Sequence, residues 1–419
     1  MVARLFLFTM RKYTIMTGKI QNAKQRNKRN IIHAVVLVLL VMISISSLAA
    51  EPYTVLEGKT LTFYYDNSKS ARSGIVYVIE EVYSKSNKPA WMGKDDYPDI
   101  TKIVIDPSFA NYCPHSTAYW FANLGNAESI EGMNYLNTSE VTDMTSMFKD
   151  CRNLTVIDCS NFNTEKVQST YDMFEDCKSI TTLDLSHFNT ANVKDMGLMF
   201  VGCKKLQSLD LANFNTECVT KMGSMFENCK SLTSINLSSF NTSDVVDMSY
   251  MFESCEALAC LDLSKLNTEK VTNMTYMFGY CKALKTLDLS GFNTENVSEI
   301  VHMFSNCIAL ETIYVSNEWS VQNISSGHEV FEGCSNLVGG NGTQWDENHI
   351  DYDYAHIDGG GSNPGYLTYK GHSGKTGIYT LHKPNTSKNA LYSIGGIRLP
   401  KESVNGIIIQ NGRKRLVQK

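Results

Sequence analysis

Residues 177–202 read CKSITTLDLSHFNTANVKDMGLMFVG, and this stretch recurs along the middle of the chain every 26 residues. A constant period in this range is the signature of a repeat protein, in which each unit packs on its neighbours. The period predicts an α/β solenoid over residues 119–338. The cysteine that opens the stretch shows the interval, at Cys151, Cys177, Cys203, Cys229, Cys255, Cys281 and Cys307.

Two different hydrophobic periods occur within each repeat. Leu206, Leu209 and Leu211 fit one short inward-facing strand, which would stack in parallel about 4.8 Å from the strands of neighbouring repeats. Thr216, at the corner that follows, stands where the N-cap of a helix is expected. We therefore expect one strand and one helix in each repeat. The apolar residues beyond the corner fall on one helical face, as in the set Val219, Met222, Met225, Phe226 and Cys229.

The first 49 residues are predicted to be a signal peptide. Basic residues precede the apolar run Ile31–Ile45, and Ser47-Leu48-Ala49 offers a cleavage site between small residues. Met16 is an alternative start of translation, and an uncleaved membrane anchor is the alternative interpretation of the apolar run. The segment predicts export of the rest of the chain.

The segments that flank the repeats differ from them in composition. Residues 50–118 are predicted to be an N-terminal β cap, because Thr60–Tyr65 and Ile75–Val82 have the pattern of a hairpin and Ile103–Ile105 of a third strand. Such a cap would cover the apolar end of the first repeat. Residues 339–369 are predicted to close the other end.

Charge is segregated along the chain, although its net value is only −5. Residues 1–30 carry eight basic residues and no acid, whereas residues 51–369 carry 20 basic and 42 acidic residues. An acidic body argues against nucleic-acid binding, which needs a basic surface. Residues 370–419 carry ten basic residues and one acid, and are predicted to form a small basic β tail.

The outward-facing residues of the predicted strands are the candidate binding surface. They form an acidic file between small, mostly hydroxyl-bearing residues. Such a file could hold cations or a basic partner, or it could be a structural ladder of hydrogen bonds to hydroxyl groups. Since aromatic and arginine anchors are almost absent, weak and repeated contact is expected. The file consists of Asp158, Asp184, Asp210, Asn236, Asp262, Asp288 and Tyr314.

Eight cysteines occupy one apolar position of the repeats and are predicted to be a structural ladder of buried free thiols rather than disulfides. No cysteine spacing suggests zinc. A cluster at His349, Asp351, Asp353, His356 and Asp358 has metal-ligand residue types, but its spacing matches no known metal motif, so an irregular polar loop is preferred. The ladder consists of Cys151, Cys177, Cys203, Cys229, Cys255, Cys281, Cys307 and Cys334.

The strings LDLSHFNTANVKDMGLMFVGC and INLSSFNTSDVVDMSYMFESC, which end at Cys203 and Cys255, resemble the 26-residue leucine-rich repeat of BspA-like bacterial surface proteins. The resemblance implies a right-handed leucine-rich-repeat coil. It also implies an adhesion protein whose partners are host matrix proteins or other cells. Residues 390–419 resemble the last part of C-terminal sorting domains of the Bacteroidetes, which implies a sorting signal.

Several functions are compatible with these features. We expect an exported protein, secreted or associated with the outer membrane, that binds proteins through the length of its repeats. The alternatives are a glycan-binding accessory protein or envelope hydrolase, and a structural spacer. The sequence shows no nucleophile, phosphate-binding or nucleotide-binding motif, so we expect no enzyme, cofactor or metal site. Contact with the membrane is expected only through the signal segment or surface anchoring.

Overall fold

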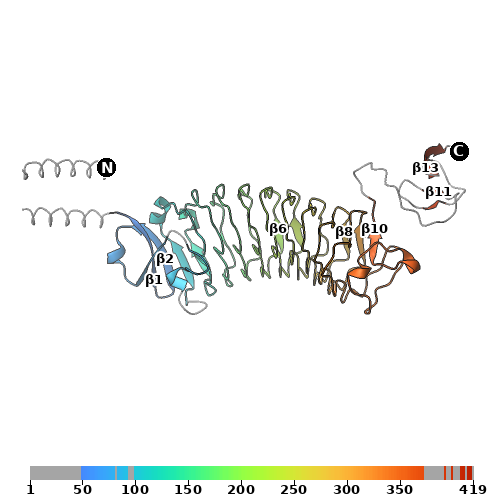
Figure 1. Cartoon of the computed structure of the whole chain (residues 1–419). Helices are drawn as coiled ribbons and strands as arrows, with labels where there is room; N and C mark the ends of the chain where they lie inside the picture. The colour runs from blue at the N-terminus through green and yellow to red at the C-terminus, as the bar shows by residue number, and fades with distance from the viewer. Residues whose placement is uncertain are drawn as a thin grey trace, which may run out of the picture.

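The computed structural model describes residues 49–80, 83–92 and 99–371, together with four strands between residues 391 and 417. The predicted signal segment therefore lies almost wholly outside the described residues. Repeats of 26 residues stand side by side in an elongated row, between a β-rich N-terminal part and a closing segment (Figure 1).

The N-terminal part contains a five-stranded sheet in the order β3-β1-β2-β4-β5. The expected pairing of Thr60–Tyr65 with Ile75–Val82 is wrong, because a strand not predicted from the sequence lies between them. A two-residue turn joins β1 to β2. It contains Gly58, whose φ of 59° suits a tight hairpin. The strands are β1 (Glu51–Glu57), β2 (Thr60–Asp66), β3 (Ile75–Val78), β4 (Lys102–Ile105) and β5 (Ser129–Glu131).

An aromatic cluster packs this sheet against the first repeat. The ring of Phe63, on β2, lies 5.6 Å from that of Trp91 and 5.4 Å from that of Phe121. The indole N–H of Trp91 donates to the backbone oxygen of Trp120 over 3.0 Å.

Short 3-10 helices lie at both ends of the row of repeats. The N-terminal ones are η1 (Lys69–Ala71), η2 (Ala90–Met92), η3 (Pro107–Asn111) and η4 (Met133–Tyr135), and those of the closing segment are η5 (Tyr352–Tyr354) and η6 (Gly360–Ser362).

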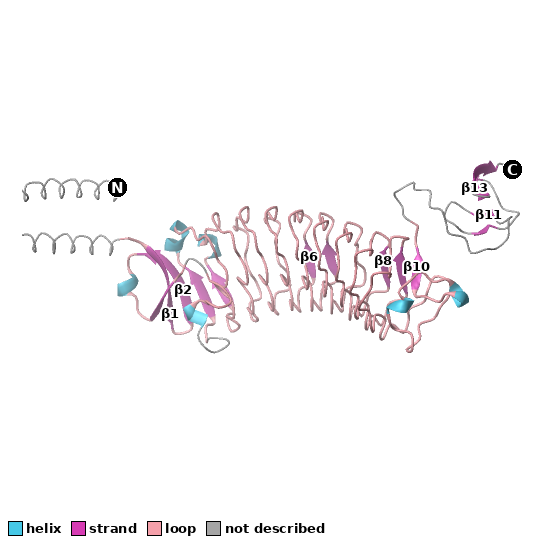
Figure 2. Ribbon diagram, in the orientation of Figure 1, coloured by secondary structure: helices cyan, strands magenta, loops and turns pink. Residues whose placement is uncertain are grey.

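The repeats contain no α-helix among the described residues, so the predicted α/β solenoid with one helix in each repeat is wrong (Figure 2). After each corner the chain makes two successive turns instead. In one repeat, Ser224 and Asn228 have φ values of 58° and 59°. A left-handed residue every fourth position interrupts a right-handed helix. The fold consists of turns and loops with short strands in small sheets.

The hydrogen bonds of these turns explain why the chain does not continue as a helix. The amide of Met225 donates to the oxygen of Met222, three residues back, over 3.2 Å. The neighbouring amides donate to the next repeat: Ser224 to Ser249 O over 2.8 Å and Phe226 to Met251 O over 3.0 Å. Alternate amides therefore join adjacent repeats, and none of these three closes an i−4 helical bond.

Thr216 does not cap a helix, which corrects its predicted role. Its buried hydroxyl donates to the backbone oxygen of Asn241 over 2.8 Å and accepts from the Asn241 amide over 2.8 Å. The side-chain oxygen of Asn215 makes the local turn by accepting from the amide of Glu217 over 2.9 Å. The Asn-Thr corner thus combines one bond within the repeat with two bonds to its neighbour.

Strands form in only part of the repeats. β6 (Ser208–Asp210) pairs in parallel with β7 (Ser234–Asn236). β8 (Thr286–Leu289), β9 (Thr312–Val315) and β10 (Leu367–Tyr369) form a second parallel sheet. The strand prediction is correct for these repeats and wrong for the equivalent residues 156–158, 182–184 and 260–262.

A second line of parallel contacts joins the repeats on the side of the turns. It consists of isolated bridges between equivalent residues, such as Asp195 with Lys221. The repeats are therefore held together along two lines, one at the short strands and one at the turns. The bridge line runs through Ser116, Asp143, Ser169, Asp195, Lys221, Asp247, Asn273, Glu299 and Ser326.

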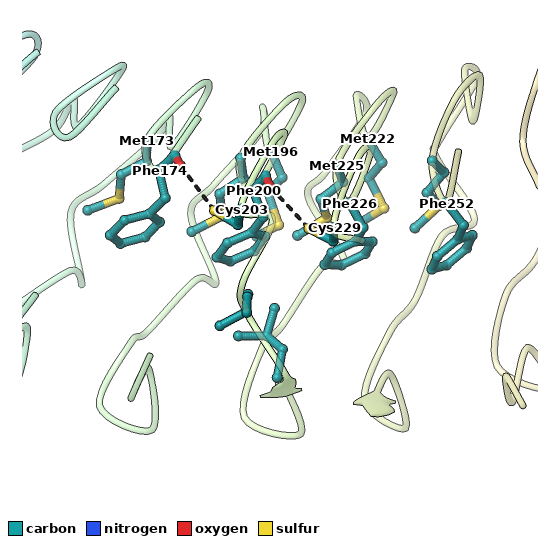
Figure 3. Packing of buried hydrophobic residues seen from close by; sticks show 14 of the residues in the cluster. Met173, Phe174, Met196, Phe200, Cys203, Met222, Met225, Phe226, Cys229 and Phe252 are labelled. Carbon is teal, nitrogen blue, oxygen red and sulfur yellow. Dashed lines mark hydrogen bonds between the residues drawn. The ribbon is translucent and has the colours of Figure 1, made fainter. Parts of the chain in front are cut away.

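A file of phenylalanine rings fills the core between these two lines (Figure 3). The rings of Phe200 and Phe226 are 5.7 Å apart with an angle of 4° between their planes, and both residues are fully buried. Each ring packs against the ring of the next repeat, so the core is continuous along the row. The file consists of Phe121, Phe148, Phe174, Phe200, Phe226, Phe252, Phe278, Phe304 and Phe331.

The closing segment covers the C-terminal end of this file. The ring of Tyr366 meets that of Phe331 edge-on at 5.1 Å. The indole N–H of Trp319 donates to Ala355 O over 2.8 Å. Because Tyr366 and Ala355 are fully buried, the end of the core is shielded from water.

Only short strands are described within the predicted basic tail. They form one sheet in the order β12-β11-β13-β14. The proposed sorting role concerns a segment that lies mostly outside the described residues. No helix among the described residues combines the length and hydropathy needed to cross a membrane. The strands are β11 (Leu391–Tyr392), β12 (Arg398–Leu399), β13 (Gly406–Gln410) and β14 (Arg413–Val417).

Replacing Phe226 by Ala should lower the free energy of unfolding by about 3–5 kcal/mol, because it leaves a cavity in the middle of the file. Urea unfolding monitored by circular dichroism would measure the loss. Val246→Ala is the control, since Val246 is 45% exposed and its truncation should cost less than about 0.5 kcal/mol. Similar losses in both variants would contradict a central role for the file.

Candidate functional site

The outward-facing file predicted from the sequence lies at the surface. We call it the acidic face; it consists of Asp158, Asp184, Asp210, Asn236, Asp262, Asp288 and Tyr314. The first six residues are exposed and Tyr314 is half-buried. The strand pairings place Asp210 opposite Asn236 and Asp288 opposite Tyr314. The structure therefore brings these residues into one line across the repeats.

Each carboxylate of the acidic face makes a local turn within its own repeat. Oδ1 of Asp184 accepts from the amide of Ser186, two residues on, over 2.9 Å. Asn236 makes the same bond to the amide of Ser238 over 3.1 Å. Backbone amides thus join the hydroxyl groups of the same serines as partners of the carboxylates, and the hydroxyl bonds are the ones expected of a structural ladder within each repeat. Asp158, Asp210, Asp262 and Asp288 repeat the arrangement.

These hydrogen bonds keep the acidic face charged. The backbone amide of Ser186 stabilises the ionised form of Asp184 and lowers its pKa below the ordinary 3.8. Hydrogen bonds from Ser160 and Ser264 lower the pKa values of Asp158 and Asp262 in the same way. The face therefore carries negative charge throughout the neutral and mildly acidic range.

One neighbouring pair relieves the repulsion between adjacent carboxylates. The side-chain amide of Asn236 donates to Oδ1 of Asp210 over 2.9 Å, which links two repeats. Two carboxylates at this separation would repel by about 1 kcal/mol in water. An uncharged asparagine in the middle of the file removes that repulsion from two neighbouring contacts.

At its C-terminal end the acidic face already holds a cation. The ammonium of Lys370, which follows β10, lies 2.5 Å from Oδ2 of Asp288 and 5.4 Å from the ring centre of Tyr314. Burial raises the pKa of Asp288, but hydrogen bonds from Lys370 and Ser290 outweigh it, so the pKa is lowered. Both charged side chains remain about half exposed. The amine of Lys370 thus reaches this face from outside the repeats, within the same chain.

Two surface hollows lie elsewhere on the described residues. The larger, of about 360 Å³, is lined by Thr142, Lys166, Gln168, Asn192 and Lys194. The other, of about 260 Å³, is lined mainly by amide and hydroxyl side chains near the start of the repeats. Neither hollow is lined by a carboxylate or a histidine.

The eight cysteines of the predicted ladder are buried, and each donates to a phenylalanine carbonyl of the preceding repeat. The thiol of Cys203 lies 3.2 Å from Phe174 O, and that of Cys229 lies 3.2 Å from Phe200 O (Figure 3). Burial raises the pKa of Cys229 to about 12, so the reactive thiolate is absent at neutral pH. All twelve cysteines of the chain are unpaired.

The polar cluster within residues 349–358 contributes to the closing loop. Asp358 is buried and accepts from the amides of Asn341, Thr343 and Gly360 over 2.7, 3.1 and 2.8 Å. Burial alone would raise the pKa of Asp358. The hydrogen bonds from these amides and from the Thr343 hydroxyl outweigh burial, so the pKa lies below the ordinary 3.8. The carboxylate is thus occupied in holding the loop together.

Sequence reasoning missed a charged cluster beside the turns. Lys149 Nζ lies 2.9 Å from Oδ2 of Asp172 and also contacts Glu175. Burial, together with the neighbouring carboxylate of Asp172, raises the pKa of Glu175 to about 7. Glu175 is equivalent to Lys149 in the following repeat, so an alignment of the repeats would have shown the two as neighbours.

Comparisons with known proteins match the repeats. A family model described as "Mycoplasma protein of unknown function, DUF285" matches residues 116–235 and 229–345, which is more than half of the chain. A search of curated proteins gave no match. Among solved structures, a chain of the crystal structure of a TLR13–ssRNA13 complex is 14% identical with a TM-score of 0.20. The match covers 57% of this chain and 42% of that chain, less than half its length.

Thiol titration should separate two classes of cysteine. In the native protein only Cys113, Cys218 and Cys260 are exposed and should react. Denaturation without a reducing agent should then release the nine buried thiols, giving all twelve. A substantially lower total after denaturation would mean that disulfides form.

Glu175 should make stability depend on pH. Its folded-state pKa of about 7 lies above the ordinary 4.5, so the folded state binds this proton more tightly than the unfolded state. The contribution to stability therefore falls as pH rises between these two values. Unfolding of Glu175→Gln should show a flatter dependence than the native protein. Glu165→Gln, which alters an exposed side chain, should keep the native dependence; equal profiles for all three proteins would contradict the assignment.

Proposed function

This chain belongs to the family described as "Mycoplasma protein of unknown function, DUF285", and we propose that it is an exported or cell-surface protein that binds other proteins through the acidic face. The face extends across successive repeats and offers the same group again and again. Partners with spaced lysine or arginine residues would fit it. The proposed outcome is adhesion to host matrix proteins or to other cells.

The contact between Lys370 and Asp288 is the observation that supports this proposal. It is an ion pair between a repeat and a residue outside the repeats, at 2.5 Å. Asp158, Asp184 and Asp262 present exposed carboxylates at equivalent positions. An exposed ion pair contributes only about 0.2–1 kcal/mol, so one contact binds weakly. Several contacts made by one partner would raise the overall affinity by multivalency.

The resemblance to BspA-like leucine-rich repeats supports the location and the class of partner. Residues 1–49 have the pattern of a signal peptide, which supports secretion or attachment to the outer membrane. The resemblance of the tail to Bacteroidetes sorting domains supports surface delivery.

A structural spacer is the second candidate function. Every Asp of the acidic face uses one oxygen to hold a turn, as Asp184 does with the amide of Ser186. If that were their whole role, the face would bind nothing and the row of repeats would present another component.

The test compares two triple variants on an array of immobilised matrix proteins and glycans. Asp158→Asn, Asp184→Asn and Asp262→Asn remove three charges from the face while keeping the turns, because Asn236 already makes the same bond. Binding to basic matrix proteins should fall roughly tenfold. The matched control combines Glu165→Gln, Glu217→Gln and Glu269→Gln, which removes three exposed charges elsewhere and should bind as the native protein does.

Each other outcome has a definite meaning. Unchanged binding by the Asp→Asn variant, or an equal loss in both variants, would contradict a specific role of the face. Hits confined to glycans would favour a glycan-binding accessory protein or envelope hydrolase. No hits with any immobilised target would favour the spacer.

A further inference from the structure

One extra residue changes the register of the repeats near their C-terminal end. Successive cysteines are 26 residues apart up to Cys307, but Cys334 follows after 27. The strands still pair with the 26-residue offset, as Leu289 does with Val315. At the turns the offset has become 27, because Glu299 bridges to Ser326. The insertion therefore lies between the strand and the turns of this repeat.

The altered register makes His302 and Glu329 equivalent residues of adjacent repeats. Both have left-handed backbones, with φ values of 53° and 54°. The amide of His302 donates to His328 O over 3.1 Å, which fixes the two backbones relative to each other. Nε2 of His302 then lies 3.1 Å from Oε2 of Glu329. Two imidazoles and a carboxylate are thus brought together at one junction between repeats.

We propose that His302, His328 and Glu329 bind a divalent transition-metal ion of the zinc class. Their ligand atoms all lie within 4.8 Å of one another, and this is the one such group in the described part of the chain. Imidazole nitrogen and carboxylate oxygen are both ordinary ligands of zinc, at about 2.0–2.2 Å. Modest side-chain rotations bring the three atoms onto one ion. Three protein ligands leave one position for water.

The surroundings of His302 fit a metal ligand. Its Nδ1 is buried and has no hydrogen-bond partner, and the nearest carboxylate, Oε2 of Glu332, is 3.8 Å away. A metal-bound histidine usually donates its other N–H to a carboxylate, which fixes the ring and its tautomer. Glu332 is itself held by the hydroxyl of Ser305 over 3.0 Å. Nε2 would bind the ion while Nδ1–H points to Glu332.

Two further contacts hold the site in place. The ring of Tyr276 stacks on that of His302 at 4.4 Å with an angle of 24°. The amide of Glu329 donates to Oδ1 of Asp351, in the closing segment, over 2.7 Å. The side chain of Glu329 is 46% exposed, so an ion can reach the site from solvent. A bound ion would link two repeats directly beside the closing segment.

The test uses tag-free protein stripped of metal with a chelator. Cobalt(II), followed by its visible absorption, should bind with one equivalent per chain, and zinc should displace it. His302→Ala and His328→Ala should each weaken binding by at least about tenfold, and Glu332→Gln by about tenfold through loss of the supporting carboxylate. His187→Ala is the matched control, because His187 is an exposed histidine of another repeat.

A second measurement covers variants that lose stability. Excess zinc should raise the melting temperature of the native protein and of His187→Ala, but not that of the double variant His302→Ala/His328→Ala. Zinc affinity or a zinc-dependent melting shift that is unchanged in the double variant would overturn the proposal. Absence of one-equivalent binding by the native protein would overturn it as well.

Discussion

The fold depends on backbone amides that cannot be satisfied within one repeat. In each pair of turns, alternate amides donate to carbonyl groups of the following repeat, as Ser224 and Phe226 do. A buried amide without a partner costs about as much free energy as a lost hydrogen bond. A single repeat would therefore be unstable alone, and the order of the whole row follows from this requirement. The phenylalanine file and the Asn-Thr corners add further contacts between adjacent repeats.

The sequence was sufficient to predict the period and the buried positions, but not the conformation of the turns. Apolar residues at Met222, Met225, Phe226 and Cys229 have helical spacing, yet successive turns closed by bonds to the third preceding residue produce the same spacing. The neglected signal was the residue type at the second of the two left-handed positions in each repeat; the first position, which includes Leu198 and Tyr250, carries no such signal. Asn228 and its equivalent Gly202 belong to types that adopt positive φ readily. Their recurrence indicates interruptions rather than a continuous helix.

The candidate site was predictable in outline only. The alternation of inward-facing and outward-facing residues in the predicted strands was enough to place Asp184 and its equivalents at the surface. It could not show that their oxygens hold backbone turns, because that depends on the local backbone geometry. The contact between Lys370 and Asp288 joins residues 82 positions apart and depends on how β10 closes the row. The sequence alone does not group His302 with residues 328 and 329, since they become its neighbours only when the inserted residue is placed.

The hydrogen bonds at successive corners are the same, and this affects how such a chain can change in evolution. Thr216 bonds to Asn241 in the same way as Thr242 bonds to Asn267, so each internal boundary is interchangeable with the next. An in-frame duplication or deletion of one repeat in the gene would recreate the same boundary at the new junction. The length of the row could thus vary between strains while both ends of the domain stay unchanged. Duplication would also lengthen the acidic face by one carboxylate at a time.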